Sequence, residues 1–101
     1  IETCQDLLQV KCAINAVLEA LKERNKTAAD VPIMVSVTIE TTGTMLLGTS
    51  IEGVVAALDQ FPIMSLGLNC ATGPAEMAEH VAYLGKHWGA GGWRGERRRI
   101  S

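Results

Sequence analysis

The residue of this chain best placed for chemistry is a cysteine that follows an apolar run. Residues 63–69 form that run, Cys70 comes next, and the pair Gly73-Pro74 is typical of the start of a helix. If the run is a strand of a parallel sheet, its carboxyl end is where ligands bind, because helix amino termini direct N–H groups there. A thiolate can act as a nucleophile or a metal ligand, although an inert buried cysteine is the commoner case.

The other candidate ligands lack the spacing of a metal site. Cys4, Cys12 and Cys70 are irregularly spaced without a Cys-x-x-Cys pair, which predicts a reducing, cytoplasmic setting rather than a disulfide framework. Cys4 follows an expected strand end, so a metal site shared with Cys70 stays open beside a packed structural role. The packed role is favoured because two ligands bind zinc poorly. His80 and His87 lack the His-Glu-x-x-His pattern and are not expected to bind metal.

The apolar periodicity predicts alternating strands and helices. It places a strand end at residues 1–3, helices over about 7–23, 51–60 and 74–85, and strands buried on both faces over about 33–39 and 63–69. This order implies an α/β fold with parallel strands joined by right-handed crossovers. Two strands and a strand end cannot close an eight-stranded barrel, so the sheet is either small and open or one section of a barrel.

Local signals predict where these helices begin and end. Thr3, with Asp6 three residues on, is the expected N-cap of the first helix, and Thr49 that of the second. Gly85 is the expected C-cap of the third helix. Gly67 interrupts a strand, which indicates a close approach of backbone or ligand.

Composition and charge limit the classes of partner. The 101 residues, 48% hydrophobic and 4% aromatic, suit one small globular domain, and no apolar run is long enough to span a membrane. Residues 1–85 hold four Lys and Arg against ten Asp and Glu, a balance of −6, whereas residues 86–101 hold five against one, a balance of +4. An acidic body disfavours binding to nucleic acid. The Gly- and Arg-rich tail is interpreted as a solvated or disordered end.

Three segments in order carry a resemblance to a known family. They are residues 1–3 (Ile-Glu-Thr) followed by Asp6, residues 32–36 (Pro-Ile-Met-Val-Ser), and residues 67–74, which include Gly-Leu-Asn-Cys. Together they resemble the homocysteine-binding, or homocysteine S-methyltransferase, domain of cobalamin-dependent methionine synthases, over residues 1 to about 85. The resemblance implies a section of a (β/α)₈ barrel, a TIM barrel, that is incomplete here. The chain starts without Met, and we expect an internal piece of a longer protein.

The resemblance also implies a chemistry and a set of residues. In that family three cysteines hold zinc, which keeps the homocysteine sulfur as a thiolate that accepts a methyl group from methylcobalamin, recharged by methyltetrahydrofolate on other domains. Cys70 matches one zinc ligand, and the other two form a Cys-Cys pair that this sequence lacks. Glu2 would receive the substrate ammonium, and Asn69 would orient the amino-acid portion or cap a turn. Homocysteine is the implied substrate, with no nucleic acid or membrane partner.

The tail and the missing cysteines leave other functions open. Residues 86–101 do not resemble the next barrel strand, so we expect a truncated, misjoined or frame-shifted end there and divide the chain at residue 85. A cobalamin-independent homocysteine methyltransferase that uses betaine or S-methylmethionine is one alternative. A non-catalytic fragment is another, because the incomplete zinc site predicts that the chain is inactive alone. The methyl donor, the oligomeric state and the role of Cys4 are left open by the sequence.

Overall fold

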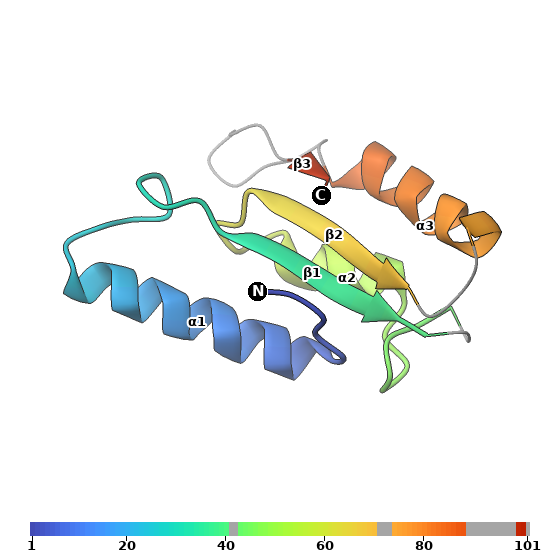
Figure 1. Cartoon of the computed structure of the whole chain (residues 1–101), viewed down its shortest axis with the longest axis horizontal. Coiled ribbons are helices and arrows are strands. Elements are labelled where there is room, and N and C mark those ends of the chain that lie inside the picture. The colour runs from blue at the N-terminus through green and yellow to red at the C-terminus, as the bar shows by residue number, and fades with distance from the viewer. Residues whose placement is uncertain (41–42, 71–73, 89–98, 101) are drawn as a thin grey trace.

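Helices and strands alternate along the chain in the predicted order (Figure 1). This computed structural model describes the backbone of residues 1–40, 43–70, 74–88 and 99–100, and the side chains of residues 1–40, 43–69 and 77–88. The elements are α1 (Leu7–Glu23), β1 (Met34–Ile39), α2 (Ile51–Leu58), β2 (Ser65–Cys70), α3 (Pro74–His87) and β3 (Arg99–Ile100). The α/β class is therefore confirmed.

The strands form a small parallel sheet in the order β1-β2-β3. Strands β1 and β2 pair over six residues, from Met34 opposite Ser65 to Ile39 opposite Cys70. Strand β3 pairs with the first two residues of β2. On the other edge of β1, Cys4 forms an isolated parallel bridge with Val37, so the amino-terminal segment takes the place of a fourth parallel strand.

Strand β1 alternates between buried and partly exposed side chains, so the prediction that both its faces are buried is wrong. One face carries residues that are at most 1% exposed, namely Val35, Val37 and Ile39. The opposite face carries the less buried Met34, Ser36 and Thr38. The sheet therefore has one apolar face and one face that is mostly polar.

The apolar face packs against residues from all three helices in one core cluster. These residues are Val10 and Ile14 from α1, four from α2 (Ile51, Val54, Val55, Leu58) and Leu84 from α3. Burial of such a contiguous apolar surface is the main favourable term in folding. Within the described residues, no helix is long and apolar enough to cross a membrane.

The helix ends differ from the predicted caps. Asp6 rather than Thr3 caps α1, because its side chain accepts a hydrogen bond from Gln9 N at 2.8 Å. Thr3 instead has φ +58°, a conformation that a β-branched residue rarely adopts. Ser50 rather than Thr49 caps α2 and accepts from Gly53 N at 3.3 Å. Helix α3 continues past Gly85 to His87, so the C-cap prediction is also wrong.

The end of the chain contributes to the fold at two places. Trp88, directly after α3, is fully buried in the core cluster. Residues 86–101, in which the sequence analysis expects no further barrel strand, contain the two-residue strand β3. The interpretation of residues 89–98 and Ser101 as a solvated or disordered end falls outside the described residues. The division of the chain at residue 85 stays a prediction.

Candidate functional site

The carboxyl end of β2 carries two of the three predicted site residues. Cys70 is the last residue of β2 and lies opposite Ile39, while Asn69 lies opposite Thr38. Asn69 is exposed, and the side chain of Cys70 lies outside the described residues. The backbone therefore places the cysteine at the strand end that the sequence predicts.

Asn69 is held by a residue that the sequence analysis does not identify. Ser36 Oγ donates a hydrogen bond to Asn69 Oδ1 across the β1-β2 pair. In the strand register Ser36 lies opposite Gly67, which has no side chain. Ser36 can therefore reach the side chain two residues farther along β2. The alternation of hydroxyl and valine side chains in residues 35–38 is the sequence signal that could have identified this polar face.

Glu2 lies beside Ser36 because of a bulge in the amino-terminal segment. Ser36 N donates to Ile1 O at 2.8 Å, and Ser36 O accepts from Cys4 N at 3.3 Å. Those two partners are three residues apart, one more than in a regular parallel ladder. The extra residue is accommodated where Thr3 takes its positive φ, and both Glu2 and Thr3 are exposed.

Glu2 and Ser36 line the same cavity. Its volume is about 320 Å³, and its lining residues are Ile1, Glu2, Met34, Val35 and Ser36. Ser36 is thus shared between the cavity of Glu2 and the hydrogen bond to Asn69. Cys70 lies opposite Ile39, which is three residues and about 10 Å beyond Ser36 along the strand. The described backbone therefore brings Glu2 and Asn69 to either side of Ser36 and places Cys70 farther toward the carboxyl edge.

Cys4 is a buried thiol on the edge of this site. Its side chain is 4% exposed, and its Sγ lies 3.9 Å from Glu2 O. Burial raises the pKa of Cys4 above its ordinary value of 9.0, opposed by the positive charge of the amino terminus and reinforced by Asp6. A thiol that stays protonated at neutral pH is a poor metal ligand. These observations favour the packed role for Cys4.

The residues that the structure describes do not fit a complete zinc site. No group of three or more His, Cys, Asp or Glu side chains among them could hold a metal ion. Cys12 is exposed on α1, and the ring of His87 stacks on Tyr83 with centroids 4.2 Å apart. Of the three-cysteine set that the resemblance implies, only Cys70 has a match in this sequence.

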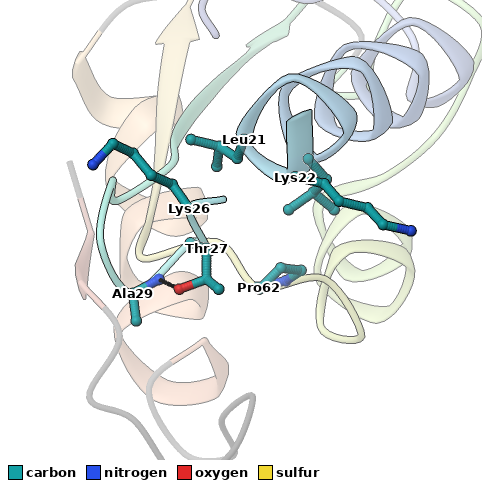
Figure 2. Close-up of a pocket in the computed structure, with 8 residues that line it drawn as sticks. Leu21, Lys22, Lys26, Thr27, Ala29 and Pro62 are labelled. Carbon is teal, nitrogen blue, oxygen red and sulfur yellow. Dashed lines mark hydrogen bonds between the residues drawn. The ribbon is translucent and has the colours of Figure 1, made fainter. Parts of the chain in front are cut away.

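A second pocket lies where α1 ends, beside the segments that lead into β1 and β2 (Figure 2). Its volume is about 290 Å³, and its floor is formed mainly by apolar residues such as Leu18, Leu21 and Pro62. Figure 2 shows the ammonium groups of Lys22 and Lys26 extending away from each other. The Glu2-Ser36-Asn69 region is the better candidate site because it contains two of the three predicted site residues. Asn69 lies at the carboxyl end of β2, where ligands of parallel α/β proteins bind, whereas the cavity of Glu2 lies beside the first three residues of β1.

Comparison with known proteins identifies related sequences. The sequence model of the family described as homocysteine S-methyltransferase matches residues 1–95. Methionine synthase from Mycobacterium leprae (strain TN) is 51% identical over 87 residues, and methionine synthase from Mycobacterium tuberculosis (strain ATCC 25618 / H37Rv) is 47% identical over 87 residues. Each alignment covers 86% of this chain and 7% of the relative, so the chain spans a small part of their length. No solved structure matches the chain significantly.

Proposed function

Because the chain belongs to the homocysteine S-methyltransferase family, we propose that it binds homocysteine for methyl transfer to the substrate sulfur, which yields methionine. In this reaction the sulfur loses its proton, forms a bond to the methyl carbon, and the donor loses the methyl group. The observation that supports the proposal most strongly is the family match over residues 1–95. The parallel α/β order is consistent with a section of a (β/α)₈ barrel, which we propose as the architecture of the complete domain.

The proposed binding site uses residues on the exposed side of the sheet. Glu2 is a carboxylate that can pair with the substrate ammonium, and Asn69 is an amide that can bind the substrate carboxylate. The hydrogen bond and the cavity described above put Ser36 between them. A site with an acceptor on one side and a donor on the other complements the two charges of an α-amino acid.

The metal and the methyl donor belong to a larger assembly in this proposal. Cys70 is proposed as one zinc ligand, and the described residues supply no complete set, so the binding proposed here depends on the amino-acid portion of homocysteine. When bound, zinc stabilises a substrate thiolate. We propose methylcobalamin as the methyl donor. It would be held by a cobalamin domain outside this chain, in a longer cytoplasmic protein that also carries a folate domain.

Ligand binding to the chain tests the proposal directly. Isothermal titration calorimetry with L-homocysteine should give saturable binding, and 3-aminopropane-1-thiol, which lacks the carboxylate, should bind more weakly. A cobalamin-independent enzyme that uses betaine or S-methylmethionine would bind homocysteine equally well. Methyl-transfer assays of longer polypeptides that contain this chain, with each methyl donor in turn, distinguish the cobalamin-dependent function from the cobalamin-independent one. A non-catalytic chain would not bind homocysteine at all.

A further inference from the structure

We propose that Ser36 is a positioning residue that turns the side-chain amide of Asn69 toward the carboxylate of the substrate. Its Oγ donates to Asn69 Oδ1, which occupies the acceptor of that amide. The inference rests on the proposed function, because it specifies how the same site recognises the amino-acid portion of homocysteine. Neither the apolar periodicity nor the family resemblance assigned a role to Ser36.

The strand register makes this contact possible. Ser36 and Asn69 lie on the same face of neighbouring strands, since Ser36 pairs with Gly67 and Asn69 pairs with Thr38. Gly67 is buried and has no side chain that could separate Ser36 from Asn69. A larger residue at position 67 would stand directly opposite Ser36 and block the diagonal contact.

The chemistry of the amide gives the contact a direction. An asparagine side chain has one carbonyl acceptor and one NH₂ group with two donors. When a hydroxyl donates to the carbonyl oxygen, the NH₂ group is left to face the ligand, where it can donate to a carboxylate. Without the hydroxyl the amide can rotate and present its oxygen, which repels a carboxylate. Ser36 therefore selects the orientation of Asn69 that suits an anion.

Glu2 gives the site a preference for a positively charged group, in addition to the preference of Asn69 for an anion. Glu2 and Ser36 line one cavity, so the carboxylate lies on the amino-terminal-segment side of Ser36 and the amide lies on the β2 side. A ligand with an ammonium group and a carboxylate on one carbon can bind to both Glu2 and Asn69. A ligand with only the ammonium group would contact Glu2 and gain nothing from the oriented amide.

Two ligands separate orientation of the amide from general stability. L-homocysteine has both charged groups, and 3-aminopropane-1-thiol keeps the ammonium and thiol but lacks the carboxylate. Calorimetric titration of Ser36→Ala should show about three- to tenfold weaker binding of L-homocysteine and unchanged binding of 3-aminopropane-1-thiol. Ser36→Thr keeps a hydroxyl and should restore binding to within about twofold of the original chain.

Two further variants keep the test independent of the folding of Ser36→Ala. Asn69→Asp retains the acceptor for Ser36 and replaces the amide donors with a carboxylate. It should therefore weaken the binding of L-homocysteine and leave the binding of 3-aminopropane-1-thiol unchanged. Thr38→Val is the matched control, because Thr38 Oγ1 is buried without a hydrogen-bond partner on the same face of β1. This variant should leave binding of both ligands unchanged.

The outcomes distinguish this inference from the proposed function. Equal losses for both ligands in Ser36→Ala, or no loss for either, would overturn the positioning role while homocysteine binding stands. Retained binding of L-homocysteine by Asn69→Asp would overturn it as well. Failure of the original chain to bind L-homocysteine would overturn the proposed function and with it the role of Ser36.

Discussion

Cys4 forms a parallel bridge with Val37 at the edge of β1, and both residues are buried in the core cluster. Thr38 N donates to Cys4 O at 2.8 Å, which continues the ladder beyond the bulge. This contact holds the segment that carries Glu2 against the strand that carries Ser36. The burial of Cys4 is therefore a condition for the geometry of the candidate site.

The stability of the chain should decrease at alkaline pH because of Cys4. Burial raises the pKa of this thiol above 9.0, so the folded state binds more protons than the unfolded state at alkaline pH. The stabilisation is fully present below pH 9.0 and is lost as the pH rises through the raised pKa. Urea unfolding between about pH 7 and 10.5 should show a shallower decline for Cys4→Ala than for the original chain.

The control for this experiment is Cys12→Ala, which removes an exposed thiol from α1. Its unfolding free energy should follow that of the original chain across the pH range. Parallel curves for Cys4→Ala and the original chain would contradict the assignment of the alkaline decline to Cys4.

The contribution of Asp30 to the stability of the chain should depend on pH in the opposite direction to that of Cys4. Its carboxylate accepts from Thr27 N at 2.8 Å and from Thr27 Oγ1 at 3.2 Å, and these bonds lower its pKa below 3.8. The resulting stabilisation is present above pH 3.8 and is lost as the pH falls through the lowered pKa. Asp30→Asn should therefore be less stable than the original chain at neutral pH, and the difference should shrink in acid unfolding measurements.

Thr27→Val provides a comparison for Asp30, since it keeps the backbone donor and removes the hydroxyl, which donates to Asp30 and also accepts from Ala29 N at 3.2 Å. The part of its destabilisation that depends on pH should be smaller than that of Asp30→Asn, because the backbone bond from Thr27 N is the larger cause of the lowered pKa of Asp30. The prediction would be contradicted if the unfolding free energies of Asp30→Asn and the original chain differed by the same amount from pH 7 to strong acid.

The identity of the cap of α1 can be tested by two alanine substitutions. Asp6→Ala removes the acceptor for Gln9 N and should cost about 1 kcal/mol of unfolding free energy. Thr3→Ala should cost much less, because Thr3 makes no capping bond and already has an unfavourable positive φ. Chemical unfolding followed by circular dichroism measures both, and a larger cost for Thr3→Ala would restore the cap expected from the sequence.

Trp88 should be essential for stability although it follows residue 85, where the sequence analysis divides the chain. The side chain is fully buried, and truncation of a core tryptophan typically costs about 3–5 kcal/mol. Trp88→Ala should therefore lower the urea midpoint strongly, whereas Val81→Ala at an exposed position of α3 should not. Equal midpoints for the two variants would indicate that residues beyond 85 do not belong to the core.

The sequence predicts the order of elements well because apolar periodicity reports which side of each helix is buried. In the first predicted helix the apolar residues Val10, Ile14 and Leu21 recur with helical spacing, and all three are buried. Periodicity is less informative for β1, where Ser36 and Thr38 interrupt an apolar run that suggested two buried faces. The distinction depends on what covers the second face, which is a property of the tertiary structure.

The candidate site is only partly predictable for a similar reason. The strand end at Cys70 and the neighbouring Asn69 are predictable from the switch between an apolar run and a helix start. The contact between Ser36 and Asn69 depends on strand register, which the sequence does not fix. The bulge beside Glu2 depends on the positive φ of Thr3, for which a threonine gives no signal.

The bulge makes the number of residues in the amino-terminal segment as important as their identity. Side chains along an extended chain alternate sides, so adding or deleting one position exchanges the two sides for everything before it. Thr3 is already the extra position of this segment, so removing it would leave Glu2 as the single residue between the two partners of Ser36 and would keep Ile1 and Glu2 on their present sides. If the segment instead kept Thr3 and paired regularly from Cys4, Thr3 would lie opposite Ser36 and the Glu2 carboxylate opposite the buried Val35, even though every chemical group of the candidate site would still be present.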